Sequence, residues 1–150
     1  MTHRLFLSLA LFATPAIAQA ATIVHYGAGC PSPNATMNHN GLPSLGTTFT
    51  VKGPSFTSPV PGTNSLGVIL VGNASTSYPV SLFGLTTCTV LVNHFNTLTE
   101  VFGVQTPVAV PNNTQLLGAQ VYFQAVAIVT SFGIPTQTVW TDAIECTLGF

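Results

Sequence analysis

The sequence predicts an all-β protein, an antiparallel sandwich of two sheets with about eight strands. Apolar and β-branched residues occur in short runs, and Gly, Pro and Asn separate these runs. No segment after residue 20 keeps the periodicity of an amphipathic helix. This pattern favours two packed sheets with Greek-key connections, in a jelly-roll or immunoglobulin-like arrangement.

Residues 116–130 form the longest charge-free apolar run outside the N-terminus. Alternate side chains of a strand point to opposite faces, and here one face is wholly apolar. We therefore predict one long buried strand, followed by another at residues 137–148. A transmembrane helix is the alternative, but it needs about 20 apolar residues, and Gln120 and Gln124 interrupt this run. We expect no membrane span.

The other strands are predicted where apolar or alternating runs lie between turn residues. They are residues 21–26, 34–40, 46–52, 66–71, 79–83, 89–93 and 97–104, with 107–111 extended. Residues 53–64 contain three prolines and are predicted to form a loop, and residues 72–78 a polar turn. Residues 79–83 form at most a short edge strand, because Pro79 cannot donate a ladder hydrogen bond. With no internal repeat or linker, residues 21–150 make one domain.

Residues 1–20 have the pattern of a secretory signal peptide. A short basic start containing Arg4 precedes an apolar stretch, and small residues then fit cleavage after Ala18 or Ala20. The mature chain would begin at Gln19 or Ala21. We expect a secreted protein, extracellular or at the cell surface.

The predicted mature chain has very little charge. Its charged side chains are Lys52, Glu100, Asp142 and Glu145, a net charge of about −2 with neutral histidines. Such a surface cannot neutralise a run of phosphates, so nucleic-acid binding and polybasic membrane attachment are not expected. Weak self-repulsion suits a protein that packs against its own copies. The alternative is that the low charge only reflects the composition of the host's secreted proteins.

Three cysteines would enter an oxidising compartment, where at most one pair can form within the chain. We expect a disulfide between Cys30 and Cys88, worth about 4 kcal/mol on a loop-entropy argument. Cys146 would then be a buried free thiol in the last strand. In the alternative, Cys146 pairs with another cysteine of the chain or with a second chain.

Several segments match, in order, the motifs of one family. They are residues 25–31 (HYGAGCP), 43–49 (PSLGTTF), Cys88, 117–118 with 122–125 (LG and YFQA), and 142–144 (DAI). They resemble the YGxGCPG opening, the P-x-L-G-x-x-F motif, the mid-domain Cys, the L-x-G…Y-x-Q-A strand and the S-N-A-L motif of a small secreted β-sandwich domain. That domain occurs in planctomycetes, myxobacteria and related bacteria, often at the C-terminus of larger chains.

The resemblance covers most of residues 26–148. It implies an extracellular β-sandwich with a disulfide between the first and middle cysteines, Cys30 and Cys88, and no settled enzymatic activity. The chain departs from the family in standing alone behind a signal peptide. It also has Cys146 where the family has an apolar residue, which leaves the role of this thiol open.

The histidines of the predicted mature chain are His25, His39 and His94, and none are two or four residues apart. Cys88 and His94 resemble part of the copper loop of cupredoxins, which are also secreted sandwiches. The axial Met of that loop is missing, because Met37 precedes the Cys. We therefore expect no metal site and no cofactor.

No catalytic constellation is predicted. Glycosidases need a carboxylate pair, but Asp142 and Glu145 should point to opposite faces of a strand, as charges at an edge or turn. A Ser–His–Asp triad from His94 and Asp142 lacks a G-x-S-x-G elbow. We expect a non-enzyme.

Carbohydrate binding is the alternative function, because sugars bind exposed aromatic platforms that need little charge. The candidate ligand-facing aromatics are Trp140, Tyr122, Tyr26 and Tyr78. Trp140 and Tyr122 could equally pack in the core. The first hypothesis remains a self-associating extracellular structural protein; the second is a carbohydrate-binding module for an extracellular polysaccharide.

Overall fold

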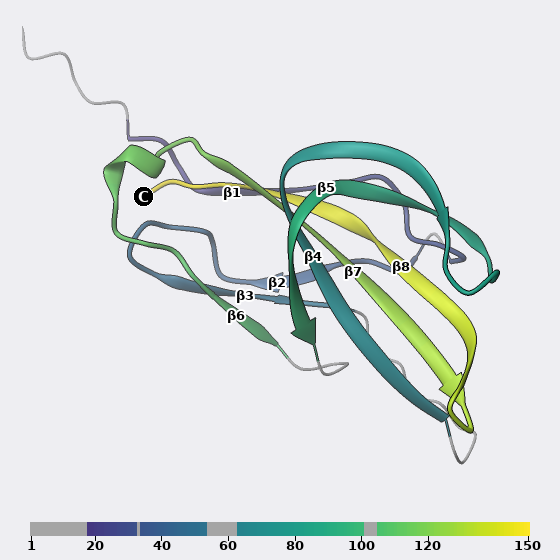
Figure 1. The fold of residues 1–150 in the computed structure, drawn as a ribbon. Coiled ribbons are helices and arrows are strands. Elements are labelled where there is room, and N and C mark those ends of the chain that lie inside the picture. The colour runs from purple at the N-terminus through teal and green to yellow at the C-terminus, as the bar shows by residue number, and fades with distance from the viewer. Residues whose placement is uncertain (1–17, 33, 54–62, 101–104) are drawn as a thin grey trace, which may run out of the picture.

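The computed structural model describes residues 18–32, 34–53, 63–100 and 105–150, which form eight strands and one 3-10 turn (Figure 1). The strands are β1 Thr22–Tyr26, β2 Asn38–Asn40, β3 Thr48–Lys52, β4 Thr63–Ser81, β5 Thr87–Glu100, β6 Thr106–Ala109, β7 Gln120–Ser131 and β8 Ile134–Thr147. The 3-10 turn is Thr114–Leu116. Three predicted features lie wholly or partly outside the described residues: residues 1–17 of the predicted signal peptide 1–20, most of the predicted loop 53–64, and residues 101–104 of the predicted strand 97–104.

Two antiparallel sheets stack as a sandwich, which confirms the predicted fold class. One sheet has five strands in the order β1-β8-β7-β4-β5, and the other has three in the order β2-β3-β6. The chain changes sheet after β1, β3, β5 and β6. The first and last strands of the five-stranded sheet are therefore neighbours, so β8 is an interior strand and β1 an edge.

The main core fills the space between the two sheets. Phe49 of β3 and Phe123 of β7 meet edge to face there, with ring centres 6.0 Å apart. Met37, Ile144 and Cys146 are buried in the same cluster. These inward positions alternate with outward ones along each strand, as the sequence pattern predicted.

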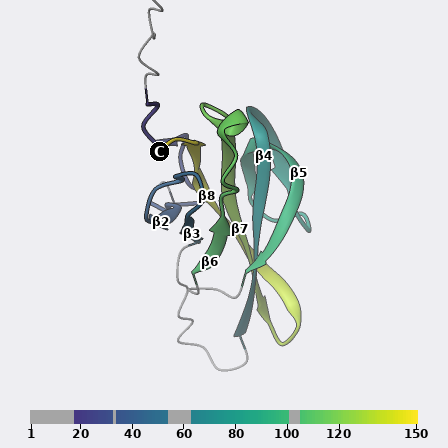
Figure 2. The ribbon, with the colours of Figure 1, turned by 90° about the vertical axis from the view of Figure 1, so that its left-hand side faces the viewer.

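The far ends of β4 and β5 fold back over the outer face of the five-stranded sheet. We call residues 72–93 the arm. Figure 2 shows β2, β3 and β6 on one side of β7 and β8, and β4 with β5 on the other. Under the arm lies a second cluster of buried residues that includes Trp140 of β8, Val126 of β7 and Val90 of β5. The five-stranded sheet, which we also call the central sheet, is thus covered on both faces.

The arm corrects the sequence-based prediction. Residues 72–78 are not a turn but the middle of a continuous β4, whose ladder with β5 shifts register after Val71, Gly72 and Ser75. Such irregularities bend and twist a strand pair without ending it, so a polar run can remain in the sheet. Residues 79–83 are accordingly the end of β4 and the turn after it, not a separate edge strand.

The strand predicted for the long apolar run 116–130 also starts later than expected. Residues 116–119 lie in the 3-10 turn and the connection after it, where Gly118 has a φ of 77° that favours glycine. Strand β7 begins at Gln120, and β8 begins at Ile134, before the predicted residue 137. No helix in the described part of the chain is long and apolar enough to cross a membrane.

Candidate functional site

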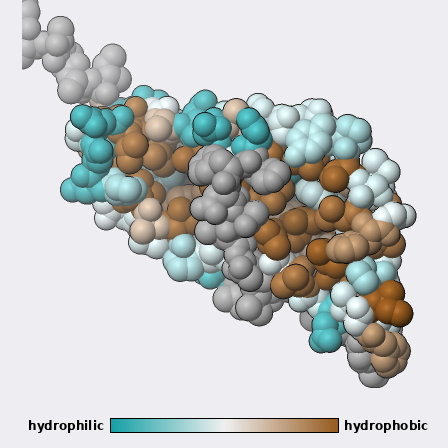
Figure 3. Space-filling view, in the orientation of Figure 1, coloured by the Kyte–Doolittle hydropathy of each residue, from teal (hydrophilic) through white to brown (hydrophobic). Residues whose placement is uncertain are grey.

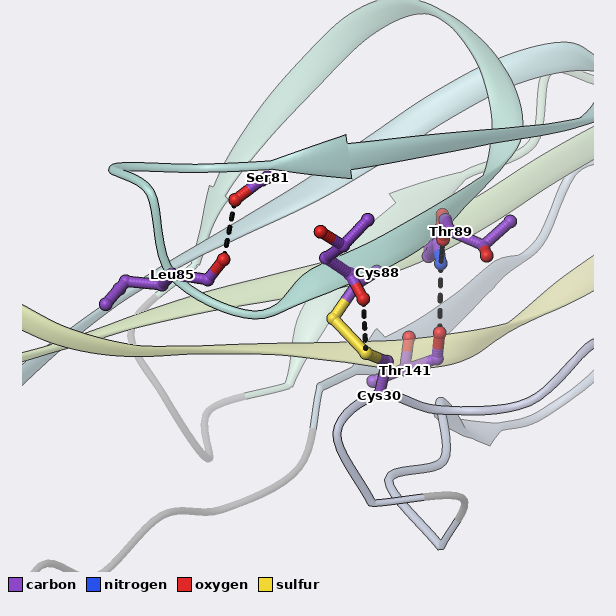
Figure 4. The surroundings of a disulfide bond; sticks show 8 residues. Cys30, Ser81, Leu85, Cys88, Thr89 and Thr141 are labelled. Carbon is purple, nitrogen blue, oxygen red and sulfur yellow. Dashed lines mark hydrogen bonds between the residues drawn. A yellow bond between two sulfur atoms is a disulfide. The ribbon is translucent and has the colours of Figure 1, made fainter.

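A disulfide joins Cys30, in the segment after β1, to Cys88 of the arm, as Figure 4 shows. Cys30 is itself paired with Trp140 of β8 by two backbone hydrogen bonds of 2.7 and 2.8 Å. The arm is therefore tied covalently to a segment that is anchored on the central sheet. The predicted pair is confirmed, and Cys88 has no thiolate to offer to a copper ion.

Cys146 is a free, buried thiol that points into the main core. Burial, and to a lesser extent the charge of Glu145, raises its pKa from 9.0 to about 12. It lines an apolar cavity of about 100 Å³, together with Phe49, Val110 and Leu148. The neutral thiol acts there as a small apolar group, as the sequence predicted.

The four candidate ligand-facing aromatics do not form one exposed platform. Trp140 and Tyr122 are only 4% and 6% exposed, because both lie under the arm. Tyr26 is half-buried, and its hydroxyl donates to the carbonyl oxygen of Leu91. Burial is the main cause that raises the pKa of Tyr26 and of Tyr122. Only Tyr78, on the arm, presents its ring to solvent.

The carboxylates are placed differently from the prediction. Asp142 and Glu145 do lie on opposite faces of β8, but they are not edge charges, because β8 is interior to its sheet. Glu145 accepts a hydrogen bond of 2.6 Å from the side-chain amide of Gln120. Asp142 is buried on the inner face. The side chains of Glu100 and His94 lie outside the described part of the structure.

Asp142 instead contacts one histidine, His25, and the backbone just before the strand that carries another, His39. Its Oδ2 is 2.7 Å from Nδ1 of His25 on β1, and its Oδ1 accepts the backbone N–H of Met37. Met37 immediately precedes β2, and the ring centre of His39 on β2 is 5.9 Å from that of His25. We call His25, His39 and Asp142 the histidine edge, since both rings lie on edge strands.

The two rings meet because both strands turn these positions inward. His25 is paired with Ile144 and His39 with Val51, and both partners are buried in the main core. Directly opposed residues of neighbouring strands point to the same face. At the open edge of a sandwich, two inward-pointing side chains from facing sheets meet across the gap. No short-range spacing carries this signal, which is why the sequence analysis missed it.

Among the described residues, no hydroxyl or thiol group is hydrogen-bonded to either ring. The same residues contain no group of three or more His, Cys, Asp or Glu placed to hold a metal ion. The histidine edge thus offers two imidazoles and one supporting carboxylate.

Two tight turns present phenylalanines to solvent. Phe83 and Gly84 lie in the connection 82–86 between β4 and β5, and Phe132 and Gly133 form the connection between β7 and β8. All four residues have a positive φ. Phe132 is 83% exposed, its neighbour Ile134 68% and Phe83 65%. We call Phe83, Phe132 and Ile134 the double-turn end, since Figure 1 shows both turns at the end of the molecule away from the C-terminus.

Comparison of the chain with protein-family models, curated proteins and solved structures found no match. The resemblance to the YGxGCPG domain therefore stays a prediction from the motifs in the sequence.

Proposed function

We propose that the protein is a secreted, non-enzymatic structural protein, extracellular or at the cell surface, whose copies associate with one another through the double-turn end. The observation that carries this proposal is the conformation and exposure of Phe132. The other features below support the same conclusion.

The backbone conformation of Phe132, with a positive φ of 50°, is unfavourable for a residue with a side chain. A left-handed conformation costs a non-glycine residue roughly 1–2 kcal/mol, and turns of this kind favour Asn-Gly or Gly-Gly instead. Its side chain gains little in return within the chain, because it is exposed. Burial of a Phe side chain is worth about 1.5–3 kcal/mol, so contact with another molecule would offset the cost. Phe83 has the same conformation in the other turn.

A second copy is the occupant that the charges favour. Beyond residue 20 the chain has one Lys and no Arg against three acidic side chains, so two copies meet with little repulsion. Figure 3 shows apolar residues gathered toward this end of the molecule. Leu66 of β4, which is paired with Ile128 of β7, is a further exposed apolar residue. Exposed apolar residues that gather on one part of a surface are typical of a protein–protein contact.

Secretion is supported by the disulfide, which is compatible with an oxidising extracellular environment. The pattern of residues 1–20 and the resemblance to a secreted domain agree with it. Carbohydrate binding has less support, because Trp140 and Tyr122 are buried and Tyr78 is the one exposed ring among the four candidate aromatics.

The test is the size of the secreted protein in solution, measured by size-exclusion chromatography with light scattering from dilute to concentrated samples. The informative variants are Phe132→Asn, Phe83→Asn and the double variant. Asn tolerates the left-handed conformation and forms an Asn-Gly turn, so each substitution removes the apolar side chain while favouring the turn. Leu42→Asn is the matched control, since Leu42 is an exposed apolar residue in the β2–β3 connection.

We expect the wild type and Leu42→Asn to form oligomers as the concentration rises. The double variant should remain monomeric, with an unfolding temperature at or above that of the wild type. A wild type that is monomeric at every concentration would overturn the proposal. A glycan array with Tyr78→Ala as control would then test carbohydrate binding.

A further inference from the structure

The histidine edge has the arrangement of a metal-binding pair. An ionised carboxylate can only accept hydrogen bonds, so the 2.7 Å contact with Asp142 places the proton of neutral His25 on Nδ1. Nε2 then carries a free lone pair. Histidines that bind metals usually donate their other ring N–H to a carboxylate or carbonyl in this way, which fixes the tautomer and the orientation of the ring.

The carboxylate is itself held in place. Asp142 is buried, and its Oδ1 accepts the backbone N–H of Met37. It therefore couples the start of β2 to β1 and sets the position of His25 relative to His39. The carboxyl group of Asp142 lies against the His25 ring, and a negative charge there favours a cation bound nearby.

The spacing of the rings suits one shared ion. Imidazole nitrogens lie about 2.0–2.1 Å from Zn²⁺, which puts the centres of two rings on the same ion roughly 5–6 Å apart. The ring centres of His25 and His39 are 5.9 Å apart, and the ring planes are inclined by 38°. The side chain of His25 is 43% exposed, so solvent can reach the pair.

We propose that His25 and His39 bind one divalent transition-metal ion, Zn²⁺ or Cu²⁺, with Asp142 as the positioning residue. Imidazole pairs select these ions over Mg²⁺ and Ca²⁺, which prefer oxygen ligands. Water molecules complete the coordination, since the described residues offer two rings and no third ligand group. This site is separate from the double-turn end, and the proposal stands whether or not the copies associate.

The experiment is a titration of the tag-free protein with Zn²⁺ at about pH 7.5, where an ordinary imidazole is neutral. Calorimetry gives the stoichiometry and affinity, and Mg²⁺ serves as the negative control. The variants are His25→Ala and His39→Ala, with His94→Ala as the matched control. His94 lies on β5, at the opposite edge of the five-stranded sheet from β1.

Wild type and His94→Ala should bind one Zn²⁺ per chain, and the other two variants at least about tenfold more weakly. The proposal is wrong if His25→Ala or His39→Ala binds Zn²⁺ as tightly as the wild type does. It is also wrong if the wild type binds Zn²⁺ no more tightly than Mg²⁺. Circular dichroism of each variant separates a lost ligand from a lost fold.

Asp142→Asn tests the positioning role. Its amide can keep the bond to Met37 only by turning its NH₂ group toward His25, which would move the ring proton to Nε2 and block the metal lone pair. We expect about 10–100-fold weaker Zn²⁺ binding and a changed tautomer in the ¹⁵N spectrum of His25. An unchanged tautomer with unchanged affinity would remove Asp142 from the site.

Discussion

The side-chain oxygen of Gln124 accepts a hydrogen bond from the backbone N–H of Leu91, 2.8 Å away. Gln124 is fully buried on β7, and Leu91 belongs to the arm, although β5 and β7 are not paired in the sheet. The amide nitrogen of Gln124 donates to the carbonyl oxygens of Thr89 and Thr141. One side chain thus satisfies backbone groups of the arm and of β8 where the arm covers the sheet.

Replacing Gln124 with Met should destabilise the protein strongly at nearly constant volume. The change removes the side-chain partner of the N–H of Leu91 and of the carbonyl oxygen of Thr141 in a buried environment. Unsatisfied buried groups cost about 1–3 kcal/mol each, so we expect a loss of about 2–4 kcal/mol. Urea unfolding measures it, with Gln137→Met on the exposed part of β8 as control, expected within about 0.5 kcal/mol of the wild type. Equal stability of both variants would contradict this role.

Removing the disulfide should be about as costly. The double variant Cys30→Ala/Cys88→Ala opens a link across a sequence separation of 58 residues. On the loop-entropy argument the unfolding free energy falls by about 4 kcal/mol. Chemical unfolding of the oxidised wild type, the reduced wild type and the double variant gives the number. If reduction does not lower the unfolding midpoint, then the contacts under the arm, and not the covalent link, hold it in place.

The fold and the candidate site could be predicted from the sequence only in part. Alternation of apolar residues predicts strands such as β3 and β7, because side-chain direction depends on local backbone geometry alone. It also predicts that Cys146 is buried. The arm depends on register shifts in β4, and the histidine edge depends on which strands form the rims of two facing sheets. Both are set by tertiary packing, so neither leaves a pattern in the order of residues.

The unfolding free energy should fall between pH 9 and pH 12, partly because of Cys146. Folding raises the pKa of this thiol from 9.0 to about 12, so the folded state holds the proton more tightly than the unfolded state. The resulting stabilisation is fully present below pH 9 and is lost as the pH rises toward 12. Tyr26 and Tyr122, whose pKa values are also raised, contribute in the same direction. Comparing the pH dependence of the wild type with that of Cys146→Ala isolates the thiol, and the variant should show the shallower fall.

The same burial makes Cys146 inert in the native protein. Without reductant, a thiol reagent should label no cysteine in the folded protein and one per chain after unfolding, because the other two form the disulfide. Rapid labelling of the folded protein would mean that the apolar cavity opens to solvent.

Gly72 lies where the arm bends. We expect Gly72→Ala to loosen the packing of the arm on the sheet and to lower the stability of the protein. A Cβ at this position would lie 2.3 Å from the carbonyl oxygen of Asn93 and 2.6 Å from a methyl group of Val92. The first contact is with backbone, so relief requires β4 and β5 to separate at the register shift. Overpacking of this kind costs about 1–3 kcal/mol. Trp140, the single tryptophan, is buried under the arm, so its fluorescence should shift to longer wavelength as water reaches it.

Ser75→Ala, at an exposed position further along the same strand, should leave both the emission and the stability unchanged. A Gly72→Ala protein with wild-type emission and stability would show that the arm tolerates a side chain at its bend.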